Sequence, residues 1–362
     1  MKILHITPTF YSDLSIVGGG ERYIEYLSES LVFKEPLAQQ IVEQAVLSFS
    51  DSFEEITKKH LRYRIIPGSV NDLNSFDFDK VHEIINDYDL VFVHQCLTDF
   101  GLYFASIAKL SNKVVIGLDH GGGKSERCQE TPFALSSYDQ LWAHSDFTAV
   151  DFKDFDVPYS VLKGPIAVEK IIKLKKRSPN LIVSVGRILP HKGFETVLKA
   201  IAGLNFQYKI IGRKYDEAYF QYIVNVADEL KVDVEIITDA SDFKVSELMS
   251  TATVYVQPSV HSSYDGRYFS KPELLGLSSL EALSHGTPTL VSTAGSLPEL
   301  GEVYGCKVFK NDSDLRDILL NRLEEIRSLD SNLIRDSVDS HYGYSKYNSE
   351  ALEEFRKLGI IK

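Results

Sequence analysis

The sequence predicts an α/β protein built from two doubly wound parallel-sheet domains. Three observations carry this prediction. Short apolar runs alternate with helix-like segments in the first half of the chain, and the same alternation restarts near residue 181. The length of 362 residues also exceeds what one hydrophobic core ordinarily serves. Short apolar runs separated by helices are typical of parallel strands that are buried on both faces.

The first half supplies five expected strands and three expected helices. The helix over residues 21–33 places Ile24, Leu27 and Leu31 on one face, which is the spacing of an amphipathic helix. The expected strands are 3–7, 45–49, 90–93, 114–118 and 141–143, and the other expected helices are 80–86 and 102–110.

The second half repeats the pattern and ends in a helix. The expected strands are 181–186, 208–212, 234–237, 253–257 and 289–292, and the expected helices are 195–202, 219–230, 245–250 and 349–358. A polar, basic stretch at 173–179 is interpreted as solvated surface near a domain boundary. We therefore place an N-terminal domain at 1–165, a second domain at 166–345 and a C-terminal helical segment at 346–362.

Composition and charge exclude several classes of function. The net charge is −12, and residues 1–165 alone carry −10, which argues against a nucleic-acid partner. The acidic first half also disfavours peripheral contact with anionic lipid, although it leaves that contact open. No apolar run approaches the length of a membrane span and the first residues read as a strand, so a cytoplasmic protein is expected. Cys96, Cys128 and Cys306 show neither zinc nor disulfide spacing and are expected to be reduced, buried thiols.

The stretch 271–300 holds the strongest chemical signal. Ser278 and Glu281 fit a Ser-x-x-Glu capping box, which predicts a helix from Ser278 to Gly286. A glycine-containing loop that leads into a helix exposes backbone N–H groups, which suit a phosphate. Glu273 and Glu281 flank this loop, and carboxylates accept hydrogen bonds from hydroxyls. A nucleoside diphosphate sugar would satisfy both carboxylates and the amides. Alternatively, Glu281 only closes the capping box and Glu273 is a solvated loop residue.

Two cations share a second loop. Arg187 follows the strand that ends at Gly186, and Lys192 precedes the next helix. A guanidinium and an ammonium together can neutralise the charge that builds on a departing diphosphate. The alternative is two surface cations without a ligand.

Two weaker signals lie in the first half. Gly18, Gly19 and Gly20 open the first helix, where glycine permits close backbone approach to a ligand, although a flexible turn is an equal alternative. His120 follows the strand 114–118 and precedes Gly121, Gly122 and Gly123, so it lies at the carboxyl end of that strand. The alternative for His120 is a hydrogen-bonded loop histidine.

These residues together resemble the signature of the family-4 retaining glycosyltransferases, which have the GT-B fold. Glu273-x7-Glu281 with Gly276-Leu277 matches one family motif, and Gly186-Arg187 with Lys192-Gly193 matches another, in the family's order. The resemblance implies two Rossmann-like domains facing a central cleft, the first for the acceptor and the second for the nucleotide-sugar donor. It also implies that the C-terminal helix returns to the N-terminal domain.

The resemblance assigns roles to individual residues. Glu273 holds hydroxyls of the donor sugar, Glu281 holds the ribose, and Arg187 with Lys192 holds the pyrophosphate. The implied catalytic residues are His120, Arg187, Lys192 and Glu273, and the implied donor-binding residues are Gly19, Gly20, Gly186, Arg187, Lys192, Gly212, Glu273, Leu274, Leu275, Gly276, Leu277, Ser278 and Glu281.

The implied function is that of a retaining hexosyltransferase that needs neither metal nor cofactor. It would move a hexose-type sugar from a nucleoside diphosphate sugar to a hydroxyl of a glycan, glycolipid or small molecule. Two alternatives fit the same motifs, namely a non-catalytic sugar-nucleotide-binding protein and a sugar-nucleotide epimerase. A nicotinamide dehydrogenase is disfavoured, because no Gly-x-Gly-x-x-Gly follows either opening strand.

Three features depart from the family pattern or compete with it. Arg213-Lys214-Tyr215 follows Gly212 where the family usually has another glycine, which puts the base contacts in doubt. The segment 260–272 is longer than usual, and it is a candidate for shaping the choice of donor or acceptor. Asp77-Phe78-Asp79 and Asp154-Phe155-Asp156 have the spacing of an Asp-x-Asp metal motif, but Asp77 or Asp79 more simply caps the following helix and Asp154 lies in a loop.

Overall fold

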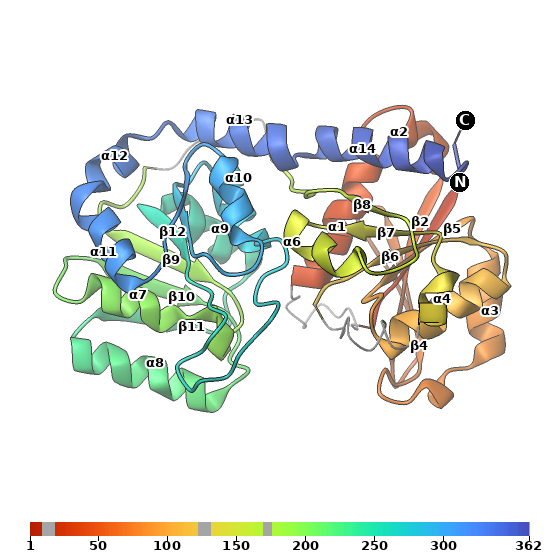
Figure 1. Cartoon of the computed structure of the whole chain (residues 1–362), viewed down its shortest axis with the longest axis horizontal. Coiled ribbons are helices and arrows are strands. Elements are labelled where there is room, and N and C mark those ends of the chain that lie inside the picture. The colour runs from red at the N-terminus through yellow and green to blue at the C-terminus, as the bar shows by residue number, and fades with distance from the viewer. Residues whose placement is uncertain (9–18, 122–131, 169–175, 362) are drawn as a thin grey trace. The chain divides into compact units, whose positions relative to one another are not determined.

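The chain forms two units, and its C-terminal helix belongs to the first of them. The computed structural model describes residues 1–8, 19–121, 132–168 and 176–361. One unit comprises Met1–Pro165 and Tyr344–Lys362, and the other comprises Ile166–Gly343 (Figure 1). The last helix therefore belongs to the first unit, although the whole second unit precedes it in the sequence.

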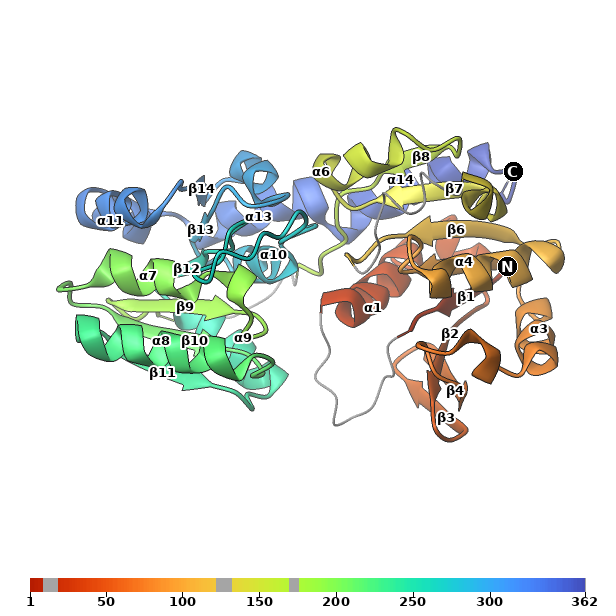
Figure 2. The same cartoon turned by 60° about the horizontal axis from the view of Figure 1, so that its bottom comes forward.

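The first unit is built on an eight-stranded sheet in the order β3-β4-β2-β1-β5-β6-β7-β8 (Figure 2). All neighbouring pairs are parallel except β3 with β4. The strands are β1 (Lys2–Ile6), β2 (Glu43–Ser50), β3 (Glu54–Lys58), β4 (Leu61–Pro67), β5 (Leu90–His94), β6 (Val114–Leu118), β7 (Gln140–Ala143) and β8 (Tyr159–Val161).

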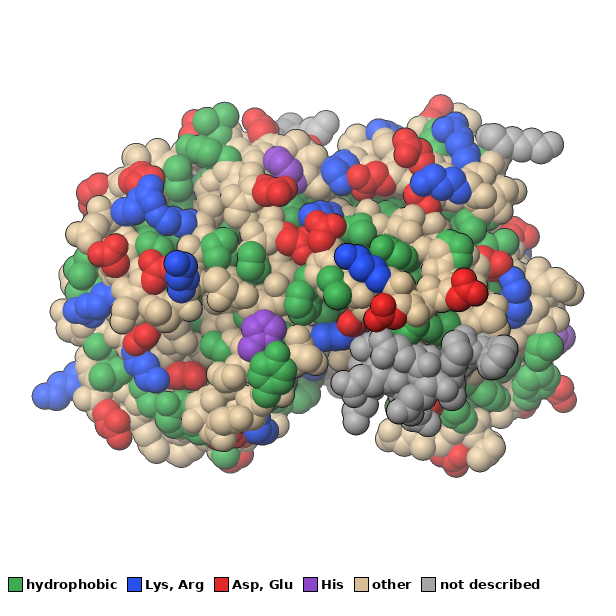
Figure 3. All heavy atoms as spheres, in the orientation of Figure 1, with side chains coloured by type: hydrophobic (Ala, Val, Ile, Leu, Met, Phe, Trp, Pro, Cys, Tyr) green, Lys and Arg blue, Asp and Glu red, His purple; other side chains and the backbone are tan. Residues whose placement is uncertain are grey.

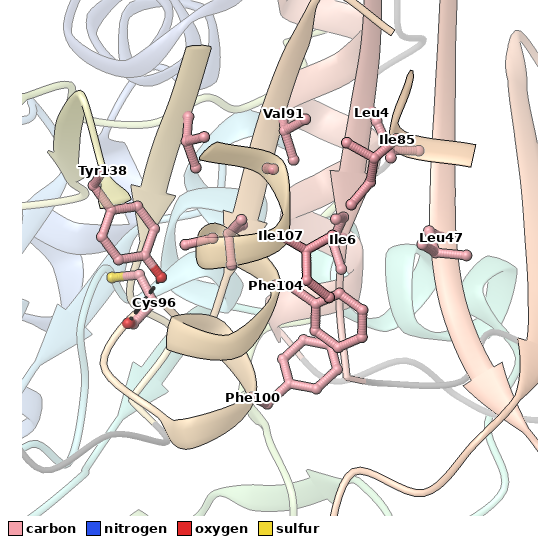
Figure 4. Close-up of a cluster of buried hydrophobic side chains, with 14 of the residues drawn as sticks. Leu4, Ile6, Leu47, Ile85, Val91, Cys96, Phe100, Phe104, Ile107 and Tyr138 are labelled. Carbon is pink, nitrogen blue, oxygen red and sulfur yellow. Dashed lines mark hydrogen bonds between the residues drawn. The ribbon is translucent and has the colours of Figure 1, made fainter. Parts of the chain in front are cut away.

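Alternation along the strands gives this sheet two different faces. Leu4 and Ile6 of β1 pack with Phe100 and Phe104 of α4, and Tyr138 closes this core by donating its hydroxyl to the Cys96 carbonyl at 3.0 Å (Figure 4). The helices of the unit are α1 (Gly19–Leu31), α2 (Leu37–Gln40), α3 (Phe78–Asn86), α4 (Asp99–Leu110), α6 (Asp146–Ala149) and α14 (Tyr344–Lys357), with 3-10 turns at Leu73–Ser75, Pro132–Ser137 and Val150–Phe152.

The opposite face carries the C-terminal helix. Phe355 of α14 packs its ring against Trp142 of β7, with ring centroids 5.7 Å apart. Asn348 of α14 donates its side-chain amide to the carbonyls of Ser30 and Leu31 at 2.8 and 3.0 Å, at the C-terminal end of α1. The Ser30 carbonyl also accepts from the Phe33 amide at 3.2 Å, whereas Asn348 is the described donor to the Leu31 carbonyl, so Asn348 caps this end of the helix. Burial of aromatic area and this cap fix α14 to the unit.

The second unit is built on a six-stranded sheet in the order β11-β10-β9-β12-β13-β14, and every pair is parallel. The strands are β9 (Leu181–Val185), β10 (Gln207–Ile211), β11 (Asp233–Ile237), β12 (Val254–Gln257), β13 (Thr289–Val291) and β14 (Cys306–Val308). This is the strand order of a doubly wound nucleotide-binding domain.

Helices cover both faces of this sheet. One apolar cluster joins α7 and α8 to Ile182, Ile210 and Val256, and a second joins α9 to Val183 and Tyr255. The helices are α7 (Phe194–Ile201), α8 (Glu217–Leu230), α9 (Asp242–Thr251), α10 (Leu277–Ser284), α11 (Asp312–Asn321), α12 (Leu323–Ser328) and α13 (Ser331–Tyr342), with 3-10 turns at Pro190–Lys192 and Leu297–Glu302.

The predicted fold class of two Rossmann-like units is confirmed. The sequence analysis missed β3, β4, β8, β14 and the helices α11 to α13. Strand β3 is the clearest case, because most of its side chains are exposed and Glu54 and Glu55 open it, so no apolar run marks it. In the described part of the chain, no helix is long and apolar enough to cross a membrane. Cytoplasmic location stays a prediction.

The distribution of surface charge and the state of the cysteines can be compared with the sequence analysis. On the face drawn in Figure 3, acidic and basic side chains are interspersed over both units. Cys96 and Cys306 are free thiols, of which Cys96 is fully buried and Cys306 partly buried. Cys128 and the first part of the basic stretch expected at the boundary, residues 173–175, lie outside the described residues.

Candidate active site

The candidate site of the second unit lies where the strand order reverses. Strands β9 and β12 are neighbours, and the chain proceeds outward from them in opposite directions. The carboxyl ends of two such strands leave a crevice in which ligands of doubly wound sheets bind. Gly186 and Arg187 follow β9, and Ser259 follows β12.

A buried ion pair joins two of the predicted residues. Lys192 ends a 3-10 turn, and its Nζ lies 2.6 Å from Oε1 of Glu273. The side chains are only 13% and 11% exposed. Oε1 of Glu273 also accepts from Nε2 of Gln257 at 2.9 Å and from the Ser259 hydroxyl at 2.6 Å. One carboxylate oxygen therefore takes three donors from two loops and a strand.

The charge of Glu273 is set by two opposed effects. Burial raises the pKa of this carboxyl, but the Lys192 ammonium and the Ser259 hydroxyl outweigh burial, so the pKa lies below its usual value. Glu273 is therefore ionised at neutral pH. All of its hydrogen bonds from described residues go to Oε1, which leaves the lone pairs of Oε2 without a described donor.

Helix α10 begins beside this carboxylate. Gly276 precedes the helix with φ of 76°, and a Cβ there would lie 2.7 Å from Leu297 Cδ2, so only glycine fits without rearrangement. The N–H groups of Leu277 and Ser278 in the first turn have no acceptor within the helix, and the described residues provide none. Among the described residues, these amides and Oε2 of Glu273 are therefore polar groups that a ligand could bind.

The predicted capping box is wrong. The helix begins at Leu277, one residue earlier than expected, and no side chain caps it. Ser278 is the second helical residue, and its hydroxyl donates to Oε1 of Gln257 at 3.0 Å and accepts from Tyr255 at 2.9 Å. The positive φ of Gly276 ends the preceding loop, so Ser278 anchors the helix to β12 instead of capping it.

Three predicted residues pack around the end of β9. A Cβ on Gly212 would lie 1.8 Å from the Gly186 carbonyl oxygen, so the two loops touch backbone to backbone. A Cβ on Gly186 would meet the aliphatic stem of Lys192 at 3.5 Å. Arg187 is exposed, and its guanidinium carbon lies 5.7 Å from the centroid of the Tyr215 ring. The two predicted cations therefore differ: Lys192 is bound to Glu273, while Arg187 rests on an aromatic ring.

The remaining predicted residues of the second unit surround the start of α10. Leu275 is 8% exposed and packs inward, and Leu274, Leu277 and Glu281 are half-buried. Glu281 lies in the second turn of α10, and its carbonyl accepts from Ser284 at 2.7 Å. The structure brings Gly186, Lys192, Glu273, Gly276, Leu277 and Ser278 together.

The predicted residues of the first unit also meet. Gly19 and Gly20 open α1, and a Cβ on Gly20 would lie 3.6 Å from Cβ and Cγ of His120. Burial lowers the pKa of His120 to about 4, so its ring is neutral at neutral pH. Gly18, Gly122 and Gly123 lie outside the described residues.

The comparisons with known proteins bear on this arrangement. Residues 167–329 match the family model described as Glycosyl transferases group 1. Residues 167–329 therefore resemble a glycosyl transferases group 1 domain, and this segment is called the group 1 domain below. No curated protein sequence matches it. The match confirms the family resemblance, and its limits fall within the second unit.

Solved structures extend the likeness to the whole chain. A sucrose-phosphate synthase from Thermosynechococcus elongatus is 16% identical, with a TM-score of 0.74 and 99% of each chain covered. Anabaena HepE, in complex with UDP and glucose, is 15% identical with a TM-score of 0.73, over 98% of this chain and 99% of that one. A putative UDP-N-acetylglucosamine 2-epimerase from Listeria monocytogenes is 14% identical with a TM-score of 0.58, over 100% and 97%. At these identities the likeness establishes the GT-B fold.

Within the group 1 domain, the sequence analysis missed two polar side chains that hold Glu273. Gln257 is 1% exposed and ends β12, and Ser259 is 1% exposed and follows it. A signal was present, because both stand at the carboxyl end of a predicted strand, where side chains of this fold reach a ligand.

The long segment 260–272 is an ordered hairpin of this domain. Ser262 and Tyr268 form an antiparallel bridge, and Arg267 pairs with Asp216 at 3.2 Å. Tyr264 stacks on Tyr222 of α8, with ring centroids 4.0 Å apart. His261 sits at the base of the hairpin, where Nδ1 lies 2.9 Å from the Phe269 carbonyl and Nε2 accepts from the Gly295 amide at 3.2 Å.

The acidic triplets do not form a metal site in the described residues. Asp77 caps α3, since its side chain accepts from the Lys80 amide at 3.1 Å, as the simpler interpretation predicted. Among residues 1–8, 19–121, 132–168 and 176–361, no group of three or more His, Cys, Asp or Glu side chains is arranged to hold a metal ion.

Proposed function

We propose that the protein is a retaining glycosyltransferase that moves a hexose-type sugar from a nucleoside diphosphate sugar to a hydroxyl acceptor. The acceptor belongs to a glycan, glycolipid or small molecule. The reaction uses side-chain cations and backbone amides where other transferases use a metal ion. The observation that carries the proposal is the Lys192–Glu273 pair beside the start of α10.

Glu273 is proposed to bind the sugar. Lys192, Gln257 and Ser259 all hold Oε1, so the carboxylate keeps one orientation and offers Oε2 to hydroxyls. An ionised acceptor suits hydroxyl donors and disfavours a phosphate at the same position. This supports the assignment of Glu273 to the sugar and not to the diphosphate.

The diphosphate is proposed to bind between the cations and the start of α10. An ammonium has three N–H donors, and described residues use one of those on Lys192. The N–H groups of Leu277 and Ser278, with the dipole of α10, add partial positive charge. Arg187 contributes a second full charge, and Glu281 takes the ribose.

The proposed reaction breaks the bond between the sugar C1 and the diphosphate oxygen and forms a bond between C1 and the acceptor oxygen. Negative charge then grows on the leaving diphosphate, and Lys192, Arg187 and the amides stabilise it. The acceptor attacks from the face that the diphosphate leaves, and its proton passes to a diphosphate oxygen. In this proposal Glu273 binds sugar hydroxyls through Oε2 and forms no bond to C1.

A substitution of Glu273 tests this proposal. Glu273→Gln keeps the shape of the side chain and removes its charge, and transfer is expected to fall by a factor of about 10² to 10³ while the protein stays folded. Glu247→Gln on the exposed face of α9 is the matched control and should keep full activity. Near-full activity of Glu273→Gln on the true substrates would refute the assignment.

The donor can be narrowed first by a thermal-shift screen with UDP, GDP, ADP and TDP, since a nucleotide that binds the native state raises its melting temperature. Product NMR with the matching nucleotide sugar then distinguishes the alternatives. Conversion of the donor without an acceptor would favour the epimerase. Tight binding without turnover across donors and acceptors would favour the non-catalytic binding protein.

A further inference from the structure

Four histidines line one edge of the first sheet, and only His120 is among the predicted site residues. His5 lies on β1, His94 ends β5, His120 follows β6, and His144 follows β7. These four strands are neighbours and parallel, so their carboxyl ends share one edge. The order reverses at β1 and β5, which makes this edge the ligand edge of the unit.

Three of the histidines form a continuous chain of hydrogen bonds. His120 Nε2 lies 2.7 Å from His94 Nδ1, and His94 Nε2 lies 3.3 Å from His5 Nδ1. His5 Nε2 lies 3.3 Å from Oε1 of Gln44, and Nε2 of Gln44 donates to the Ser28 carbonyl at 2.8 Å. The rings of His94 and His120 are nearly parallel, with 13° between their planes.

The direction of each bond follows from the Ser28 carbonyl, which can only accept. The amide nitrogen of Gln44 must face that carbonyl, so its oxygen faces His5 and accepts from His5 Nε2–H. A neutral ring that donates through Nε2 is an acceptor at Nδ1, so His94 donates through Nε2 to His5. By the same step, His120 donates through Nε2 to His94.

This assignment of donors and acceptors from one ring to the next requires that the rings are neutral. Burial lowers the pKa of His5 to about 4 and that of His120 to about 4. Burial, together with the neighbouring histidines, also holds the pKa of His94 well below its usual value. Tyr23 and His144 also pack against the His120 ring, with centroids 5.3 and 4.9 Å away.

We propose that Gln44, His5 and His94 are positioning residues that hold His120 in its Nε2–H tautomer, so that Nδ1 presents a lone pair to a hydroxyl of the bound substrate. Nδ1 of His120 has no partner among the described residues, and the His120 side chain is only half-buried. The ligand class follows from the tautomer, because a bare ring nitrogen accepts from O–H and repels phosphate oxygen. That the hydroxyl belongs to a sugar substrate rests on the proposed function.

Substitutions can either break the series of hydrogen bonds from Gln44 to His120 or preserve it. His94→Phe preserves an aromatic ring and removes both nitrogens, so His120 loses its acceptor. His94→Gln keeps an acceptor toward His120 and a donor toward His5, and is the conservative variant. Gln44→Leu removes the anchor, which lies three hydrogen bonds away from His120, and it serves the same purpose where His94→Phe fails to fold.

Nitrogen-15 NMR of the full chain with labelled histidine reads the tautomer directly and needs no substrate. The expected result at pH 7 is a bare Nδ1 and a protonated Nε2 for His5, His94 and His120. In His94→Phe or Gln44→Leu, the His120 signals should shift toward a mixture of tautomers, and His94→Gln should restore the wild-type pattern.

Two results would overturn the inference. One is a wild-type His120 that carries its proton on Nδ1, or is an imidazolium, at pH 7. The other is a His120 pattern that His94→Phe and Gln44→Leu both leave unchanged. Because the spectrum is recorded without donor or acceptor, failure of the tautomer prediction is distinguishable from failure to detect sugar transfer.

Discussion

The Lys192–Glu273 pair is expected to stabilise the second unit as well as to serve its site. Lys192→Met removes the ammonium and leaves a carboxylate that is 11% exposed without its counter-charge. Loss of one partner of a buried pair costs about 3–5 kcal/mol. For a unit of this size each kcal/mol moves the melting temperature by about 2–4 °C, so a fall of about 6–20 °C is expected.

The loss of stability in Lys192→Met should grow as the pH rises. In the wild type the folded-state pKa of Glu273 is lowered, so its contribution is present above the unfolded-state pKa and is lost as pH falls through the folded value. In Lys192→Met, burial is no longer outweighed and should raise the pKa of Glu273. The deficit relative to wild type should therefore be largest at pH 8 and should narrow toward pH 5, where the carboxyl is protonated.

Calorimetry of three variants measures this effect. Lys244→Met removes one partner of a pair on α9 whose side chains are 47% and 35% exposed, and it should cost less than about 1 kcal/mol. The double variant Lys192→Met/Glu273→Leu should recover much of the lost stability, because no unpaired charge remains. A melting temperature of Lys192→Met that moves no more than that of Lys244→Met, at every pH, would refute the reasoning.

Three further predictions follow from packing and burial. Gly212→Ala should lower the melting temperature of the second unit, since its Cβ would lie 1.8 Å from a backbone oxygen, whereas Gly203→Ala meets no atom within 4 Å and should cost only the strain of its positive φ; equal and negligible shifts would contradict this. Asn348→Leu should destabilise the first unit by about 1–3 kcal/mol in urea unfolding, because the buried Leu31 carbonyl loses its donor and the Ser30 carbonyl keeps, among the described residues, only the Phe33 amide, and an unchanged midpoint would count against the cap. The pKa of His5 and that of His120 are lowered to about 4, so their stabilising effect is complete above the unfolded-state value and declines as pH falls below about 6.5, by about 2 kcal/mol for each ring at pH 5. A first-unit melting temperature that does not fall between pH 7 and pH 5 would contradict the burial of neutral rings.

Several strands that are buried on both faces were predicted from the sequence, whereas the exposed edge strand β3 was missed. The apolar runs of β1, β5, β9 and β12 are buried on both faces, so their composition alone marked them and thereby the fold class. Strand β3 escaped detection because it is an exposed edge strand that opens with Glu54 and Glu55. Local apolar patterning identifies strands in the sheet interior better than those at its edges.

The site was predictable where residue type and strand position coincide. Glu273, Lys192 and Gly276 stand in recognisable patterns, and the structure brings them together. The role of Ser278 was mistaken, because Gly276, two residues before it, takes the N-cap position, and Ser278 is already inside the helix. The histidine chain was hidden for another reason: His5, His94 and His120 are far apart in the sequence, and only the sheet order makes them neighbours.

A crystal structure with a bound nucleotide tests the central claim most directly. The nucleotide should be whichever of UDP, GDP, ADP and TDP stabilises the protein most. The account predicts diphosphate oxygens within hydrogen-bond distance of Lys192 Nζ and the Leu277 and Ser278 amides, with the ribose hydroxyls at Glu281. A diphosphate bound elsewhere on the second unit, with the Lys192–Glu273 pair untouched, would contradict it.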